Sequence, residues 1–157
     1  MYELQRTQRI PASAEQVWNF IASAQNLKEI TPGHMGFEIT SRGLPDKMYA
    51  GMFICYNVRP LLGVKIKWVT EITQLKEQDY FVDEQRKGPY RRWVHTHAFA
   101  DERGGTRVAD SVEFEVPFGW LVGRFVMRDV KRIFAFRHEA LLERFGGSGP
   151  SRSPGPS

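Results

Sequence analysis

The amino-acid sequence predicts an α+β domain in which a curved, seven-stranded antiparallel sheet wraps around one long C-terminal helix, with two short helices after the first strand. Three observations lead to this prediction. Residues 2–10 alternate loosely between apolar and polar side chains and stop at Pro11, which suits a strand. Six further alternating segments follow, separated by short turns. About 25 residues with apolar side chains at helical spacing come after them.

The segment after Pro11 predicts the two short helices. Ser13 and Gln16 have the spacing of a capping box, in which each side chain bonds the backbone of the other residue. A second short helix is expected over residues 24–30, because Thr31, Pro32 and Gly33 end the pattern there.

The middle of the chain changes to a period of two residues, which is typical of strands. We expect strands at residues 35–41, 52–59, 64–73, 80–86, 91–100 and 106–116. Most of the turns between them contain glycine, proline or aspartate, as hairpin turns do. Short connections of this kind predict an antiparallel meander.

The last helical segment is the only element long enough to cover one face of this sheet. Its apolar residues keep to one side of the helix: Val122, Val126, Val130, Ile133, Phe134, Leu141 and Phe145. We expect its arginine and lysine residues to lie mostly on the other side, and the aromatic residues of the chain to occupy core-like positions or strand faces. A curved sheet around one helix leaves a space, so the topology predicts a cavity.

The composition excludes several classes of protein. The chain has 157 residues and one cysteine, Cys55, which excludes an intramolecular disulfide and a cysteine-rich metal site. No apolar run approaches the roughly 20 residues that span a bilayer. The N-terminus lacks the apolar stretch of a signal peptide, so we expect a cytoplasmic protein. One domain is expected at residues 1–145, followed by a disordered Gly/Ser/Pro tail at residues 146–157.

The net charge of +4 belongs to the C-terminal part of the chain. One unit comes from Arg152 in the tail, three come from residues 120–145, and the residues before Trp120 are neutral. Such a distribution is typical of the solvated side of a helix. A nucleic-acid surface would need a continuous stripe of exposed cations with aromatic side chains for stacking, so we expect no nucleic-acid partner.

Several motifs resemble one known family: VRPLLG at residues 58–63, WVTEI at 68–72, FVDEQRKGPY at 81–90, WVHTHAF at 93–99, DSV at 110–112 and PFG at 117–119. Together with the element order they resemble the START/SRPBCC superfamily, which has the helix-grip fold. Within it, they look like the bacterial ligand-binding SRPBCC group related to polyketide cyclases and dehydrases. The resemblance spans residues 1 to about 145. It implies a pocket for a hydrophobic ligand, with cyclase-like or hydrolase-like chemistry in some relatives.

Alternation assigns side chains to the concave face of the sheet. If the apolar-rich set of each strand is concave, the predicted ligand-contacting residues are Tyr56, Trp68, Phe81, Gln85, Trp93, Phe99 and Phe114. The same face carries four further polar residues: Asp83, His95, His97 and Asp110. Buried charges are costly unless they are paired, so these polar groups need a structural or chemical reason.

Three interpretations of these four polar residues stay open. The first is a structural hydrogen-bond network. The second is a ligand-orienting set in an apolar pocket, with a histidine as general base and a carboxylate as its partner. The third is a facial triad of His95 and His97 with Asp83 or Asp110 around a metal ion. The spacing does not contain a full ligand set, so we expect no metal and no other cofactor.

Alternate turns of a meander lie at the same end of the sheet. The connections at residues 60–63, 88–90 and 117–120 fall at one end, and all three carry apolar side chains. In hormone receptors that the sequence resembles, loops at these places act as gate and latch. We therefore expect Leu61, Leu62, Tyr90 and Trp120 to surround the cavity mouth.

Two functional hypotheses follow. The leading one is binding of a hydrophobic small molecule, such as a lipid, polyketide or aromatic metabolite, by a monomer or weak homodimer. The alternative is a cyclase, dehydratase or hydrolase that uses a His–Asp pair in the same cavity.

Overall fold

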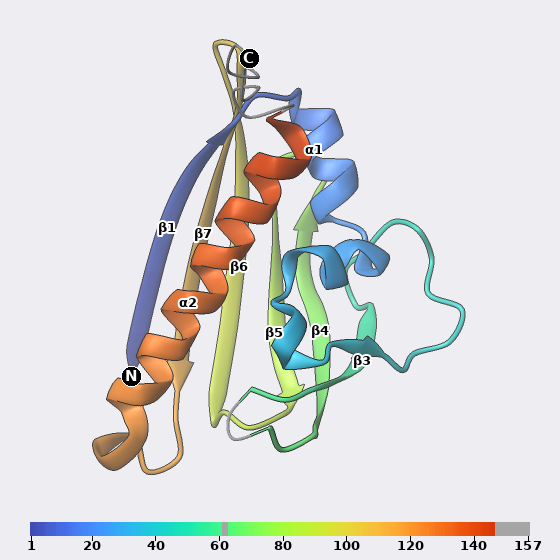
Figure 1. The fold of residues 1–157 in the computed structure, drawn as a ribbon. Coiled ribbons are helices and arrows are strands. Elements are labelled where there is room, and N and C mark those ends of the chain that lie inside the picture. Colours follow the sequence, from blue (N-terminus) through green and yellow to red (C-terminus); the bar gives the residue numbers. More distant parts are fainter. Residues whose placement is uncertain (61–62, 147–157) are drawn as a thin grey trace, which may run out of the picture.

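A computed structural model describes residues 1–60 and 63–146, and it confirms the predicted fold class. Seven strands form one antiparallel sheet in the order β1-β7-β6-β5-β4-β3-β2. They are β1 (Tyr2–Ile10), β2 (Glu38–Ile39), β3 (Phe53–Val58), β4 (Ile66–Lys76), β5 (Tyr80–Lys87), β6 (Arg92–Glu102) and β7 (Gly105–Glu115). The long helix α2 (Gly119–Phe145) crosses the concave side of this sheet (Figure 1).

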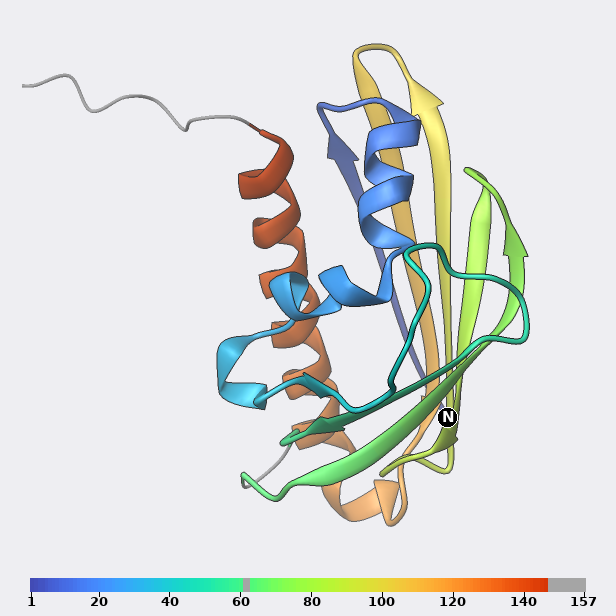
Figure 2. The same cartoon turned by 90° about the vertical axis from the view of Figure 1, so that its right-hand side faces the viewer.

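The chain begins at one edge of the sheet and must cross it to begin the meander at the other edge. Strand β1 pairs with β7, whereas β2 and β3 lie at the opposite edge. The crossing segment contains α1 (Ala14–Ile21) and the 3₁₀ helices η1 (Ala24–Ile30) and η2 (Gly33–Met35). Figure 2 shows these three helices on the same side of the sheet as α2.

The predicted capping box begins α1. The Ser13 hydroxyl accepts a hydrogen bond from the Gln16 backbone N–H, and the Gln16 side chain accepts one from the Ser13 N–H, both at 3.2 Å. Two donors that would be unpaired at a helix start are thereby satisfied. The helix buries Val17 and Ile21, which fixes the entry of the chain into the crossing segment.

Several elements differ from the sequence-based expectation in their bounds or type, and three differences are informative. The strand expected at residues 35–41 is reduced to β2, because Met35 ends η2 and Gly36 adopts a left-handed conformation with φ of 54°. The second short helix has the expected bounds, and it is of the 3₁₀ type. Strands β6 and β7 extend into the expected turn and leave only Arg103 and Gly104 between their ends, with Gly104 at φ of 79°.

The buried apolar residues near the sheet form two main groups. In one, Trp18 of α1 packs with Phe81 and Phe99 of the sheet. In the other, Val130 and Phe134 of α2 pack with Phe114 of the sheet. Buried polar residues His95, His97 and Asp110 lie on strands that pass between the two groups. Within the described part of the chain, no helix is long and apolar enough to cross a membrane.

Candidate functional site

A cavity of about 160 Å³ lies between the concave face of the sheet, η1, η2 and α2. Side chains from every layer line it. The helical segments contribute Leu27, Ile30, Met35, Ile133 and Phe134, and the strands contribute mostly aromatic and branched residues. Most of the lining is apolar, but Asp83, His95, His97 and Arg137 meet on one side. This combination is typical of a small-molecule site, in which a few polar groups orient an otherwise hydrophobic ligand.

Strand register brings the predicted polar residues together. His95 and His97 are two residues apart on β6, so both point to the concave face. On one side His95 pairs in register with Asp83 of β5, and on the other His97 pairs with Asp110 of β7. Cross-strand neighbours lie within side-chain reach, so three adjacent strands are sufficient to build this cluster.

Arg137 of α2 completes the group, and sequence reasoning missed it. Its residue surface is only 7% exposed, and it extends from the helix toward the two histidines and Asp110. Arg137 lies between Phe134 and Leu141 on the buried stripe of α2. The signal that could have located it is a cation at a position where helical spacing requires an apolar residue.

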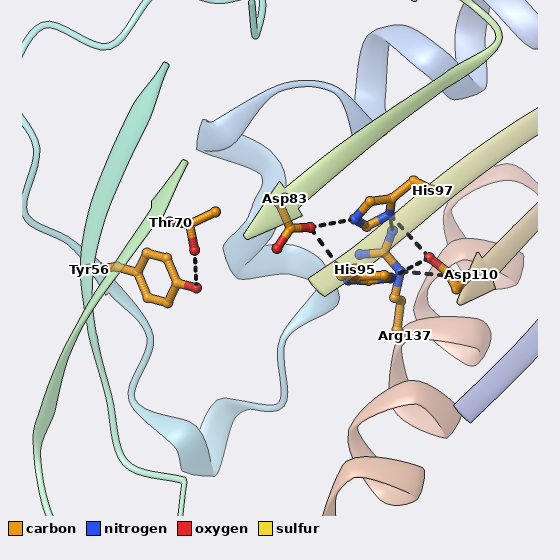
Figure 3. A network of polar contacts seen from close by, with 7 residues as sticks. All are labelled: Tyr56, Thr70, Asp83, His95, His97, Asp110 and Arg137. Carbon is orange, nitrogen blue, oxygen red and sulfur yellow. Dashed lines mark hydrogen bonds and ion pairs between the residues drawn. The ribbon is translucent and has the colours of Figure 1, made fainter. Parts of the chain in front are cut away.

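The five residues Asp83, His95, His97, Asp110 and Arg137 form what we call the polar cluster (Figure 3). Asp83 Oδ2 lies 2.7 Å from His97 Nε2 and 3.5 Å from His95 Nδ1. Asp110 Oδ1 lies 2.9 Å from His95 Nε2 and 3.1 Å from His97 Nδ1. Each carboxylate therefore contacts both histidines.

Arg137 reaches the cluster from the helix side. Its Nη2 lies 3.1 Å from His97 Nδ1, and its Nε lies 3.6 Å from Asp110 Oδ2. The two imidazole rings lie close together, with centroids 3.7 Å apart. Apolar rings hold them on both sides, since His97 stacks on Phe81 at 4.1 Å and His95 meets Phe134 at 5.1 Å.

The surroundings keep both carboxyl groups ionised. Burial acts to raise the pKa of Asp83, but the hydrogen bond with His97 and the charges of the histidines and Arg137 outweigh it and lower the pKa. Burial likewise opposes ionisation of Asp110, yet Arg137 and the bonds with both histidines hold its pKa well below the usual value. Burial and the neighbouring His97 lower the pKa of His95, which favours its neutral form.

His97 Nδ1 faces two partners with opposite requirements. Asp110 Oδ1 can only accept a hydrogen bond, whereas Arg137 Nη2 can only donate one. When Nδ1 carries a proton, it can donate a hydrogen bond to Asp110. When Nδ1 carries none, it can accept a hydrogen bond from Arg137. The cluster also contains two carboxylates against one guanidinium, so gain or loss of a single proton changes its net charge. Such a group can hold or release a proton next to the cavity.

The other side of the cavity is an aromatic wall, which we define as Phe37, Tyr56, Trp68, Tyr90 and Trp93. Ring centroids in contact lie 4.8 to 5.9 Å apart. The Tyr56 hydroxyl bonds Thr70 Oγ1 at 3.0 Å, as Figure 3 shows, and burial raises the pKa of Tyr56 far above its usual value. Trp68 Nε1 is buried and has no hydrogen-bond partner among the described residues.

The structure places the predicted ligand-contacting residues in the cavity lining, in the core, or, for Gln85, in a supporting position. Tyr56, Trp68, Phe81 and Trp93 line the cavity, together with Asp83, His95 and His97. Phe99 and Phe114 face the same side of the sheet but lie in the core instead. Trp18 of α1 covers Phe99, with ring centroids 5.1 Å apart, and Phe114 packs with Val126 and Val130 of α2.

Gln85 and Asp110 take supporting positions. The Gln85 side chain donates to the Tyr90 carbonyl at 2.6 Å and accepts from the Tyr90 N–H at 3.3 Å. It therefore fixes the turn that presents Tyr90, and it does not line the cavity. Asp110 lies behind the histidines and contacts them, again without lining the cavity.

The residues expected at the cavity mouth separate as well. Tyr90 lines the cavity, and Leu61 and Leu62 lie outside the described residues. Trp120 is 87% exposed at the start of α2 and lines a different, shallow depression with Met1, Tyr2 and Arg91. The expectation that the aromatic residues of the chain occupy core-like positions or strand faces is therefore wrong for Trp120 and for the exposed Phe125.

Asp83, His95 and His97 also place three potential metal-ligand atoms within 4.8 Å of one another. Asp110 bonds both histidines from behind, as carboxylates do in many histidine–metal sites. The guanidinium of Arg137 adjoins the same group and opposes binding of a further cation. A metal site therefore stays a hypothesis, and the geometry favours a proton as the exchangeable cation.

Comparisons with known proteins address the family through a family model and the fold through solved structures. Residues 10–139 match the family model described as polyketide cyclase / dehydrase and lipid transport. A search of curated proteins gave no significant match. Similar solved structures include a protein from Thermus thermophilus, with 21% identity, a TM-score of 0.69, and coverage of 94% of this chain and 100% of that chain.

Two further neighbours extend this comparison. A START superfamily protein from Mycobacterium smegmatis is 14% identical with a TM-score of 0.71, covering 93% of this chain and 98% of that one. The protein XoxI from Bacillus cereus is 14% identical with a TM-score of 0.68, covering 94% and 97%. At these identities the likeness establishes the fold alone.

Proposed function

Because the chain belongs to the polyketide cyclase/dehydrase and lipid transport family, we propose that its cavity binds a small hydrophobic molecule with one polar end. The observation that carries this proposal is the cavity itself, which is aromatic on one side and holds the polar cluster on the other. An apolar body would contact the aromatic wall, and a polar group would meet Asp83 or a histidine.

The cavity volume indicates the size of the ligand. An apolar cavity of about 150 Å³ in another protein holds benzene. The cavity here, of about 160 Å³, therefore suits a single aromatic ring or a short branched chain without rearrangement. A larger lipid or polyketide would require the helices to move away from the sheet.

The polar end of the ligand is expected to be a hydrogen-bond donor. Asp83 contacts both histidines through Oδ2, and Figure 3 shows its other oxygen turned away from them. Asp83 keeps 18% of its side chain accessible and lines the cavity. An ionised carboxylate accepts strong hydrogen bonds from a phenol or alcohol and repels an anion. Arg137 does not reverse this preference, since Asp110 and His97 already engage it.

Three matched probes test this proposal by isothermal titration calorimetry: 4-ethylphenol, ethylbenzene and 4-ethylbenzoate. We expect 4-ethylphenol to bind about tenfold more tightly than ethylbenzene, and 4-ethylbenzoate to bind most weakly. Asp83→Asn should reduce the preference for the phenol, whereas Asp101→Asn at the exposed end of β6 should leave it unchanged. Absence of saturable binding of all three probes to folded protein would overturn the proposal.

A second candidate function is acid–base catalysis in the same cavity. The specific observation is that His95 and His97 both line the cavity while hydrogen-bonded to carboxylates. Such pairs act as general bases in hydrolysis and dehydration. For the hydrolase alternative, 4-nitrophenyl acetate is a suitable probe. Wild-type protein should cleave it faster than His97→Gln, and equal rates would count against catalysis by this histidine.

A further inference from the structure

The N-terminal end of α2 exposes a group of large apolar side chains that the cavity does not use. Phe118, Trp120, Leu121 and Phe125 are 68%, 87%, 62% and 61% exposed. We call this group the helix tip. Soluble proteins expose single hydrophobic residues routinely, but a contiguous exposed group commonly marks an interaction surface.

The packing of the opposite face fixes the outward direction of the helix tip. Gly123 and Val126 are buried against the sheet, and the Tyr2 hydroxyl donates to the Gly119 carbonyl at 3.0 Å. A Cβ at Gly123 would overlap the Tyr2 hydroxyl, so only glycine permits this close approach. The helix cannot rotate to bury its apolar tip without breaking this contact with β1.

Cations follow the apolar tip on the same outer face. Arg124, Arg128, Lys131 and Arg132 are all exposed, and none of them makes an ion pair within the described part of the chain. Asp129 is the single acidic residue between Trp120 and Arg132. The outer face therefore combines an apolar end with unneutralised positive charge, which begins at Arg124 within the tip and continues for about two turns beyond Phe125.

The helix tip lies at the end of the molecule where the cavity-lining turns are found. Figures 1 and 2 both place the start of α2 at the same end as the β5–β6 connection and the end of β3. Tyr90 in the β5–β6 connection and Pro60, two residues after β3, line the cavity. A partner that covers the helix tip would therefore face the same end as these residues.

We propose that the helix tip docks on the surface of an anionic lipid bilayer. Trp, Phe and Leu side chains partition into the interfacial region of a bilayer, and neighbouring arginine and lysine residues attract anionic headgroups. The apolar residues occupy the tip, Arg124 lies at its inner end and the other three cations lie behind it, which matches the order of the acyl boundary and the headgroup layer. This docking rests on the surface alone and goes beyond the function proposed for the cavity.

The charges also disfavour the other partners. A symmetric pair of chains joined at this face would enclose the four cations of each copy in one interface, with Asp129 as the single acidic residue that each copy supplies between Trp120 and Arg132. Single-stranded nucleic acid would use Trp120 and Phe125 for stacking, but it would leave Leu121 without a role. Both alternatives are outcomes of the test below.

Sedimentation with lipid vesicles tests the proposal on the full chain. We expect binding to vesicles of equal parts phosphatidylglycerol and phosphatidylcholine, at least tenfold weaker binding to phosphatidylcholine alone, and loss of affinity as salt rises. Trp120 is the one highly exposed tryptophan, since Trp18 and Trp68 are buried and Trp93 is partly buried. Its fluorescence emission should shift to shorter wavelength on binding, and Trp120→Phe should remove the shift while preserving sedimentation.

Matched variants separate the two components. Leu121→Ser combined with Phe125→Ser should reduce vesicle binding at least tenfold, whereas Phe53→Ser, at an equally exposed aromatic residue on β3, should not. Arg124→Gln with Arg128→Gln should remove the preference for anionic lipid, and Arg42→Gln should keep it. Equal binding to both vesicle types, self-association through the tip, or binding of single-stranded DNA without vesicle binding would each overturn the proposal.

Discussion

The two sides of the cavity are stabilised in different ways. In the aromatic wall, Tyr56, Trp68, Tyr90 and Trp93 contact through ring faces and edges, and their contribution follows the apolar area that they bury. In the polar cluster, each charged group depends on a specific partner, and removing one leaves another buried without compensation. We therefore expect the aromatic wall to tolerate conservative substitution and the polar cluster not to.

The largest effect is expected at Arg137. Arg137→Met keeps much of the side-chain volume but leaves Asp110 and Asp83 buried with no guanidinium beside them. Removing one partner from a buried ion pair costs about 3 to 5 kcal/mol of unfolding free energy. Urea denaturation monitored by circular dichroism measures this change.

A variant on the outer face provides the control. Arg124→Met removes a cation from the exposed side of the same helix and should change the unfolding free energy by less than about 0.5 kcal/mol. Adding Asp110→Asn to Arg137→Met should restore part of the lost stability, because the amide needs no counter-charge. Equal effects of Arg137→Met and Arg124→Met would show that the buried guanidinium contributes no specific pairing.

Arg137 also shows where sequence reasoning reaches its limit. Strand alternation locates Asp83, His95, His97 and Asp110, because a period of two fixes the face of every strand residue once one face is known. An arginine on an amphipathic helix is usually solvated, so its place among apolar residues is a weak signal without the contacts from the sheet.

Phe99, Phe114 and Trp120 illustrate a second limit. Alternation assigns Phe99 and Phe114 to the correct face but cannot say which parts of that face are covered by helices. Trp18 of α1 covers one residue and Val130 of α2 the other, so neither reaches the cavity. The sequence places Trp120 at the cavity mouth, but the rotation of α2 set by Gly123 and Tyr2 directs it outward. Contacts between elements distant in sequence decide all three cases.

An intermediate loss of stability is expected when the pH is lowered, and this loss should originate in the polar cluster. The pKa of His95 in the folded protein is below the ordinary value of 6.5, so unfolded chains bind a proton more readily as pH falls below about 6.5. The stability contributed by neutral His95 is present above that pH and is lost as pH falls toward the folded-state pKa. Asp83 and Asp110 act in the same direction below about pH 4, because their folded-state pKa values are also lowered.

Thermal or urea unfolding between pH 7 and 5 measures the contribution of His95. One proton gives a slope of at most about 1.4 kcal/mol per pH unit. His95→Gln should flatten the slope over this range, whereas His34→Gln, in an exposed 3₁₀ turn, should leave it unchanged. An identical slope in wild type and His95→Gln would place the acid sensitivity outside the polar cluster.

The smallest effects are expected from polar atoms within the aromatic wall, where the hydroxyl of Tyr56 has a hydrogen-bond partner and the indole N–H of Trp68 has none among the described residues. The Tyr56 hydroxyl bonds Thr70 Oγ1, so Tyr56→Phe leaves the threonine hydroxyl without its partner and should cost about 1 kcal/mol of unfolding free energy.

Trp68 Nε1 has no partner among the described residues, so Trp68→Phe loses ring area but also removes a buried, unsatisfied donor. Because these two terms oppose each other, Trp68→Phe should cost clearly less than the roughly 3 to 5 kcal/mol typical of truncating a buried aromatic residue to alanine. Chemical denaturation of Trp68→Phe and Trp68→Ala in parallel decides the point. If the two variants lose the same stability, the unpaired indole carries no penalty, and ring area alone describes the aromatic wall.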